Sequence, residues 1–102
     1  MDCENEMVYS KPYYKLIQEE SIEDKKVYYK FVNWLLGEFD LYLQENSTGL
    51  KVYYPGGWLS IKNTTDFTIE ITIASKSKIV CEKKYSQLVS IYNQVKRTFR
   101  YN

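Results

Sequence analysis

Residues 52–58 contain the side chains best suited to binding a partner. Three aromatic residues surround a Pro-Gly-Gly turn, with one lysine before it at position 51 and another after it at position 62. If strands flank the turn, their alternation places Tyr53 and Trp58 on the solvent side of the sheet, together with the two lysines. Aromatic rings beside basic side chains are typical of hot spots in protein interfaces. The predicted protein-binding residues are Tyr53, Trp58, Lys51 and Lys62.

The same aromatic pair has other interpretations. A Tyr–Trp pair on neighbouring strands stabilises a hairpin by itself, and a register shift of one residue moves both rings to the opposite side of the sheet. Exposed rings in a basic setting also stack on the bases of single-stranded nucleic acid. Protein binding, nucleic-acid binding and support of the hairpin therefore all remain open.

Charge is distributed unevenly along the chain. Residues 1–50 contain ten acidic and five basic side chains, and residues 51–102 contain three acidic and nine basic ones. This division indicates either a basic face for nucleic acid or an acidic partner, or two halves that complement each other within one domain. Lys-rich surfaces also serve simply to keep a protein in solution. For nucleic-acid binding, the alternative function, the candidate residues are Lys83, Lys84, Lys96, Arg97 and Arg100.

The chain has no His and two Cys, which argues against most enzymes. His is the commonest general acid or base and a frequent metal ligand, and no Gly-rich phosphate-binding motif is present. The carboxylates at positions 19–24 suit a helix start. Cys81, beside two lysines, fits an activated thiolate less well than a small buried residue of a strand. We predict a protein that is not an enzyme, with no catalytic residue, metal or cofactor.

Hydrophobic periodicity predicts the elements that position these residues. Helices are expected at 10–20, with Ser10-Lys11-Pro12 as the start, and at 21–37 and 85–99. Ser21 is the expected cap of the second helix and Gly37 its stop. Alternating residues predict strands at 39–44, 50–54, 58–62 and 67–73, with a short fifth strand at 79–81. The aromatic residues expected in the core are Phe31, Trp34, Phe67, Tyr92 and Phe99.

This order predicts an α+β fold, α-α-β-β-β-β-(β)-α. It is a two-layer sandwich, in which an antiparallel meander of four to five strands is covered on one face by an N-terminal helical region and a C-terminal helix. The length fits a single domain, residues 1–102, with residues 1–9 as a candidate disordered start.

No stretch approaches the roughly 20 apolar residues of a membrane span, and the acidic N-terminus does not resemble a signal peptide. We expect a cytoplasmic protein that does not bind membranes and has two free thiols, Cys3 and Cys81. Abundant Lys, Asn, Ile and Tyr are typical of AT-rich genomes, such as those of low-GC bacteria and their phages. The expected function is that of a regulator, inhibitor or immunity-type factor that binds another protein. The sequence does not predict its oligomeric state.

Overall fold

The computed structural model describes residues 7–101, and the side chains of residues 7–98. The described elements are β1 (Val8–Ser10), β2 (Tyr13–Ser21), α1 (Lys25–Glu38), β3 (Leu43–Asn46), β4 (Leu50–Tyr54), β5 (Gly57–Thr65), β6 (Thr68–Ser75) and α2 (Lys78–Tyr101). All strands join one antiparallel sheet in the order β1-β2-β6-β5-β4-β3. The predicted α+β class with an antiparallel sheet is confirmed. The described chain differs in having six strands and two helices instead of four to five strands and three helices.

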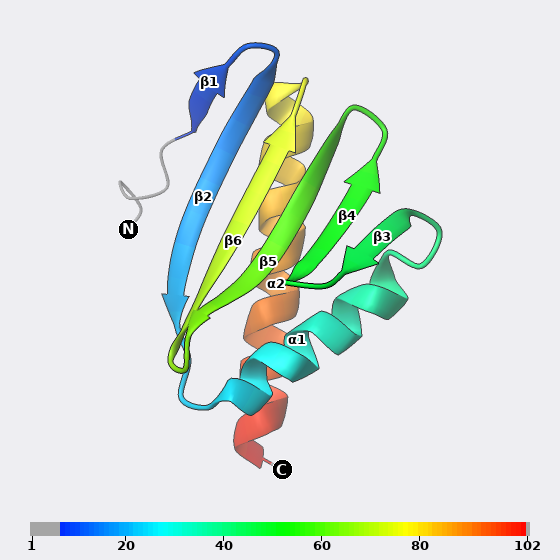
Figure 1. Cartoon of the computed structure of the whole chain (residues 1–102). Helices are drawn as coiled ribbons and strands as arrows, with labels where there is room; N and C mark the ends of the chain where they lie inside the picture. Colours follow the sequence, from blue (N-terminus) through cyan, green and yellow to red (C-terminus); the bar gives the residue numbers. More distant parts are fainter. Residues whose placement is uncertain (1–6, 102) are drawn as a thin grey trace.

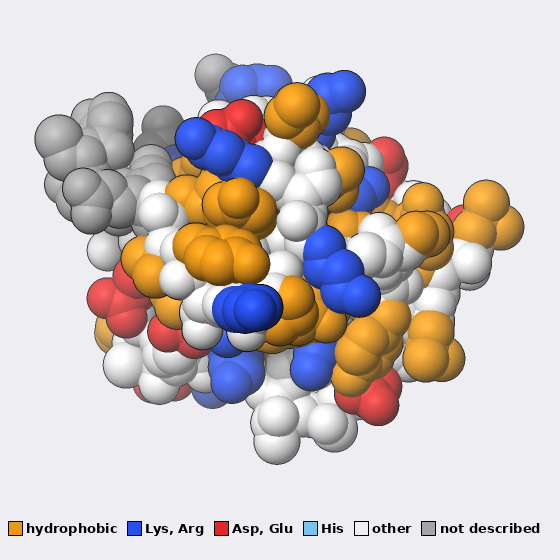
Figure 2. Space-filling model, turned by 90° about the horizontal axis from the view of Figure 1, so that it is seen from above, with side chains coloured by type: hydrophobic (Ala, Val, Ile, Leu, Met, Phe, Trp, Pro, Cys, Tyr) orange, Lys and Arg blue, Asp and Glu red, His pale blue; other side chains and the backbone are white. Residues whose placement is uncertain are grey.

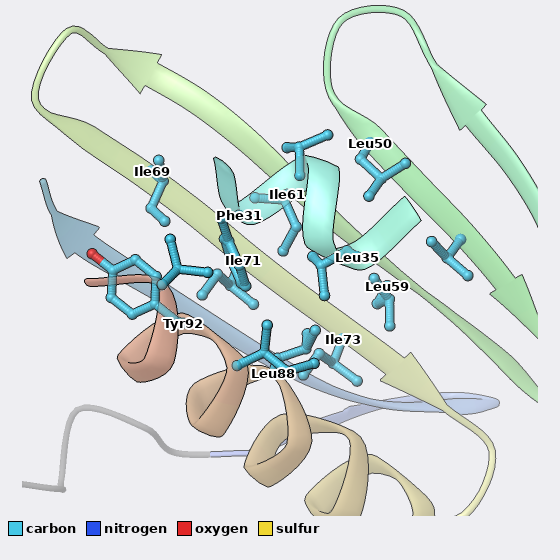
Figure 3. Packing of buried hydrophobic residues seen from close by; sticks show 14 of the residues in the cluster. Phe31, Leu35, Leu50, Leu59, Ile61, Ile69, Ile71, Ile73, Leu88 and Tyr92 are labelled. Atoms are coloured by element: carbon cyan, nitrogen blue, oxygen red, sulfur yellow. The ribbon is translucent and has the colours of Figure 1, made fainter. Parts of the chain in front are cut away.

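Both helices lie on one side of the sheet (Figure 1). α1 contacts α2 and β5, and α2 also packs on β2 and β6. The core lies between these layers, where Phe31 and Leu35 of α1 and Leu88 and Tyr92 of α2 meet the buried side chains of the strands (Figure 3). None of the described helices covers the opposite face of the sheet.

Most of the helix predicted at 10–20 is strand β2, and its predicted start is the end of β1 and the turn after it, which is the largest error in the prediction. β2 pairs with β6, and Leu16 lies opposite Ile73. Leu16 is buried towards the helices, while its neighbour Ile17 is exposed on the other side, as alternation in a strand requires. The apolar residues here also have helical spacing, but the longer of the two pairings of β2, with β6, joins segments far apart in the chain and is not visible in local periodicity.

α1 begins later than predicted. Its N-cap is Asp24 rather than Ser21, and the carboxylate of Asp24 accepts a hydrogen bond from the backbone N–H of Lys26 at 2.9 Å. Ser21 is the last residue of β2, and its carbonyl oxygen accepts a hydrogen bond from the hydroxyl of Tyr92. Aspartate and serine cap helices about equally well. Asp24 is the cap here because Ser21 is still part of the sheet.

α1 also ends later than predicted, and this delays the next strand. The helix passes through Gly37, and the buried Phe39 is its C-cap. The strand predicted at 39–44 therefore begins only at Leu43. Phe39 is buried in the core as the cap of α1, so it is not the first residue of the alternating strand that the sequence predicts.

The short strand predicted at 79–81 is the first turn of α2. Ser77 precedes this helix, and its Oγ accepts a hydrogen bond from the backbone N–H of Val80 at 3.3 Å, as an N-cap does. Cys81 is buried as expected, but in a helix. In the described part of the chain, no helix is both long and apolar enough to cross a membrane.

The aromatic residues predicted for the core fall into three groups. Phe31 and Tyr92 are buried, and their ring centroids lie 5.2 Å apart. Trp34 is 40% exposed, since it lies at the margin of the apolar stripe of α1, and Phe67 is 62% exposed, so both of these predictions are wrong. Phe99 lies outside the described side chains.

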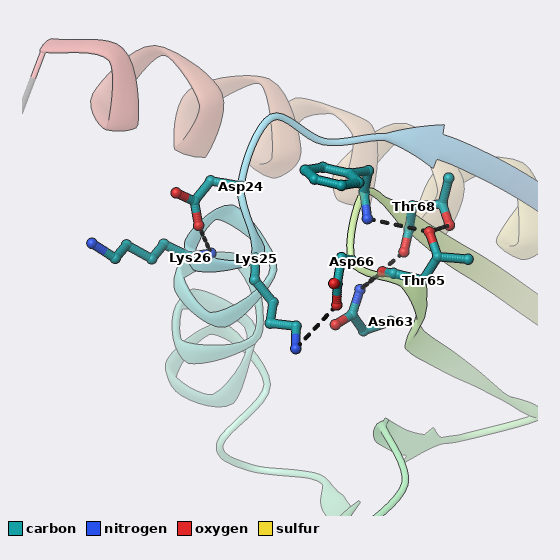
Figure 4. Close-up of polar contacts among 8 residues, drawn as sticks. Asp24, Lys25, Lys26, Asn63, Thr65, Asp66 and Thr68 are labelled. Carbon is teal, nitrogen blue, oxygen red and sulfur yellow. Dashed lines mark hydrogen bonds and ion pairs between the residues drawn. The ribbon is translucent and has the colours of Figure 1, made fainter.

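The turn between β5 and β6 explains the exposure of Phe67. Thr65 Oγ1 accepts a hydrogen bond from the backbone N–H of Phe67, and Asn63 donates to the first carbonyl of β6 (Figure 4). A register shift between Asn63 and Thr65 interrupts the alternation, so Phe67 belongs to the turn. Asp66 joins this turn to α1 through an ion pair with Lys25 at 3.2 Å, and that hydrogen-bonded contact raises the pKa of Lys25.

The candidate disordered start at 1–9 overlaps the first strand. Val8 and Tyr9 belong to β1, which pairs with β2. Residues 1–6, including Cys3, lie outside the described residues.

Buried phenols make the fold sensitive to alkaline pH. Burial, with a smaller effect from the charge of Glu20, raises the pKa of Tyr92 to about 12. In the unfolded chain a tyrosine ionises near pH 10, so between about pH 10 and 12 the folded protein binds more protons than the unfolded chain. The free energy of unfolding therefore falls as the pH rises through this window. We expect urea denaturation to show this fall and Tyr92→Phe to make it shallower. An equal slope in the two proteins would contradict the assignment, and the half-exposed Tyr53→Phe is the control.

Candidate functional site

The helix-free face of the sheet is formed by side chains that point away from α1 and α2. The strand register places five of these side chains side by side, each the direct partner of the next. They form a row across five strands, which we call the aromatic row: Lys15 of β2, Ala74 of β6, Trp58 of β5, Tyr53 of β4 and Leu43 of β3.

Trp58 and Tyr53 are direct cross-strand partners in the aromatic row. The Nζ of Lys51 lies 4.5 Å from the ring centroid of Trp58 and 5.0 Å from that of Tyr53. The Nζ of Lys15 lies 5.9 Å from the Trp58 ring, and the Tyr53 hydroxyl donates a hydrogen bond to Glu45 at 3.0 Å. A cation over an exposed aromatic face contributes about 0.5–1 kcal/mol. These contacts therefore hold both rings in place.

A hollow of about 280 Å³ lies beside the aromatic row. Short side chains form its floor, namely Ser60 and Thr72, which are buried although no described helix covers them. Trp58, Lys51 and the turn at 47–49 surround it. The hollow exists because long side chains surround short ones. The prediction does not include the hollow, because Ser60 and Thr72 come together only through the pairing of β5 with β6.

All four predicted protein-binding residues lie on the helix-free face. Lys51, Trp58 and Lys62 line the hollow, and Tyr53 stands beside Trp58. Both rings are half-buried, which leaves part of each ring available for contact. The structure thus brings these four side chains together, while their role in binding stays a prediction.

The charges of this face differ between its two ends. Lys15 and Lys51 lie near the Trp58 ring, whereas Glu19 and Glu70 face each other farther along β2 and β6. Figure 2 views the molecule from above, along the sheet and not onto its helix-free face, and at this end of the molecule basic side chains are interspersed with hydrophobic ones. Lys62 lies opposite Glu70 and Glu45 lies opposite Lys51, so neither end carries charges of one sign alone. Because Lys15 and Lys51 both lie near the Trp58 ring, an anionic group is attracted to that ring.

The residues predicted for nucleic-acid binding lie on α2, behind the sheet. Lys83 and Arg97 are exposed. The ammonium group of Lys84 lies 5.1–5.8 Å from three aromatic rings, and that of Lys96 lies 5.0 Å from the tyrosine one turn before it. At 1.5 Å per residue, roughly 20 Å separates Lys83 from Lys96 along the helix. These residues therefore do not form one basic patch with the aromatic face. The side chain of Arg100 lies outside the described ones.

Cys81 is poorly placed for nucleophilic chemistry. Its side chain is fully buried, with Sγ 3.5 Å from the carbonyl oxygen of Tyr14. Burial raises the pKa of the Cys81 thiol, and a protonated thiol is a weak nucleophile. Among residues 7–101, no three Cys, Asp or Glu side chains are grouped so that they could hold a metal ion.

Comparison with known protein families gives no family model that matches the chain. A comparison with curated proteins gives no match either. Inference about function therefore depends on the geometry of the helix-free face.

Proposed function

We propose that this protein is a small non-enzymatic binding factor whose helix-free face, centred on the aromatic row, binds another protein. The main support is the cross-strand pair of Trp58 and Tyr53. This pair is half-buried, stands beside the hollow and is flanked by Lys15 and Lys51. Trp, Tyr and basic side chains at the centre of an uncovered surface have the composition of an interface hot spot.

The charges indicate what the partner presents. Lys15 and Lys51 place two positive charges around the Trp58 ring, and Lys62 adds a third at the hollow. A partner segment with a carboxylate next to an apolar side chain complements this arrangement. Its apolar group packs on the indole or enters the hollow, and its carboxylate meets an ammonium group.

A regulator, an inhibitor or an immunity-type protein acts in this way, by covering a partner without transforming it. The buried Cys81 supports the non-enzymatic part of the proposal, since its thiol is protonated and inaccessible. A free, buried thiol also suits a reducing compartment, and we extend the proposal to the cytoplasm on that ground.

Replacement of Trp58 tests the proposal. The tagged protein is used to capture its partner from a lysate of the source organism, and the purified pair is then titrated by calorimetry. We expect Trp58→Ala to weaken binding about thirtyfold or more, since loss of a hot-spot side chain costs about 2 kcal/mol or more. Lys51→Glu is expected to weaken it as well, by repelling the carboxylate of the partner.

The second tryptophan provides the matched control. Trp34 is on α1, away from the helix-free face, and Trp34→Ala should leave the affinity unchanged. Both variants should keep the thermal unfolding midpoint close to that of the parent protein. Equal loss of binding in the two variants would refute the assignment of the face. So would tight, salt-sensitive binding of single-stranded DNA that Lys83→Glu abolishes, a result that would favour the nucleic-acid alternative.

A further inference from the structure

The edge strand β3 and the loop before it have an exposed apolar run. Leu41 is 92% exposed and Leu43 is 70% exposed, and Tyr42 between them is exposed as well. Among the described residues, β3 is the last strand of the sheet and pairs only with β4. Its outer side therefore presents backbone N–H and C=O groups that can pair with a further strand.

Edge strands of soluble proteins are usually protected against such pairing. The common devices are a very short strand, a Lys or Pro on the edge, or a bulge. The other edge of this sheet fits the rule, since β1 has three residues and leads directly into Lys11 and Pro12. Residues 38–46 contain no Lys and no Pro, and the pairing of β3 with β4 has no register shift. β3 is short as well, with four residues, and carries the charge of Glu45, but it lacks the Lys, the Pro and the bulge of a fully protected edge.

Acidic residues accompany the apolar run. Residues 38–46 contain Glu38, Asp40 and Glu45 and no basic side chain, and Asp40 and Glu45 are exposed. Glu45 follows Leu43 by two positions, so both side chains lie on the same face of β3. Glu45 lies opposite Lys51 of β4 and accepts the hydrogen bond of Tyr53, and its carboxylate can accept further hydrogen bonds beside these. The edge therefore offers one apolar and one negative position at the spacing of alternate residues in a strand.

We propose that β3 accepts an extended basic segment of a partner protein as a seventh strand. The backbone of this segment pairs with the outer side of β3, as in other cases of strand addition. Its apolar side chain packs beside Leu43 and lengthens the aromatic row, and a Lys or Arg two residues away meets Glu45. A second copy of this chain fits less well, because self-pairing of β3 brings two acidic edges together.

Short synthetic peptides test the requirement for basic charge. One peptide alternates Val and Lys, a second Val and Ser, and a third Val and Glu. Each is titrated into the full-length isotope-labelled protein, and amide chemical shifts are followed by NMR. We expect the Val–Lys peptide to bind about tenfold or more tightly than the Val–Glu peptide, a difference of about 1.4 kcal/mol. The largest shifts should be those of the amides of Leu43 and Glu45.

Three variants separate the edge from other surfaces. Leu43→Lys should abolish binding of the Val–Lys peptide, and Glu45→Lys should reverse the preference in favour of the Val–Glu peptide. Val8→Lys, on the exposed opposite edge, is the control that should leave binding unchanged. Equal affinity for all three peptides, shifts confined to β1, or a dimer of this chain that Leu43→Lys dissociates would each overturn the proposal.

This inference uses the edge of the sheet and goes beyond the proposed function of its face. Trp58→Ala should leave peptide binding at β3 intact, whereas Leu43→Lys should remove it. The two proposals can therefore fail separately, since each is tested by a different substitution.

Discussion

Phe31→Ala is expected to lower the free energy of unfolding by about 3–5 kcal/mol. The Phe31 side chain is fully buried, and its ring contacts Tyr92 across the two helices (Figure 3). No other contact replaces those that the Phe31 ring loses, and the surrounding strands cannot move freely into the cavity that it leaves. A domain of this size is typically stable by only about 5–15 kcal/mol, so the variant should be only marginally folded at body temperature.

Urea denaturation followed by circular dichroism measures this loss. Tyr29→Ala is the matched control, because it removes a similar ring from the same helix at a position that is largely exposed. Its cost should stay below about 1 kcal/mol. If Phe31→Ala cost no more than Tyr29→Ala, this result would contradict the burial of Phe31 between α2 and the sheet.

Gly57→Ala is expected to destabilise the protein by about 3 kcal/mol or more, at the upper end of the cost of overpacking. A Cβ at position 57 would lie 2.1 Å from the carbonyl oxygen of Ala74 and 2.9 Å from the Cα of Ser75. Both atoms belong to the backbone of β6, which pairs with β5 at this point. The close approach of two strands therefore admits only glycine, and relief requires the strands to separate.

A second glycine gives the opposite expectation. A Cβ at Gly37 would meet no atom within 4 Å, and the residue lies inside α1. Gly37→Ala should stabilise the protein by about 0.5–1 kcal/mol, because alanine favours the helix. Thermal unfolding of the two variants compares them directly. A shift of the same sign in both would contradict the strand contact at Gly57.

Local patterns were enough to predict the middle of the chain. The alternation in residues 50–54 and 58–62 matches β4 and much of β5, because each strand pairs with its neighbour through a short turn. The apolar stripe around Phe31 likewise matches α1, whose buried face follows from helical spacing alone.

Elements that depend on distant partners were not predicted. β2 has a spacing that also suits a helix, and it is a strand because it pairs along its length with the distant β6 and at its start with β1. Ile79 and Val80 favour a strand locally, but the capping by Ser77 starts a helix there. Local periodicity cannot decide between such alternatives when the deciding contact lies elsewhere.

The candidate site shows the same division. The pairing of Tyr53 with Trp58 follows from a short turn, so the sequence predicts that these rings stand together. The floor of the hollow combines Ser60 of β5 with Thr72 of β6, and the aromatic row begins on β2 with Lys15. Neither feature can be seen before the strand order is known.

The pairing of β2 with β6 has a consequence for synthesis on the ribosome. Leu16 and its partner Ile73 are 57 positions apart in the chain. At about 5–20 residues per second, β2 is translated about 3–11 s before its partner strand. The hairpins of β3 to β6 can form as they emerge, whereas β2 can pair until then only with the three residues of β1. The nascent chain therefore completes its sheet late, and a ribosome that stalls before residue 68 leaves β2 available to any other strand nearby.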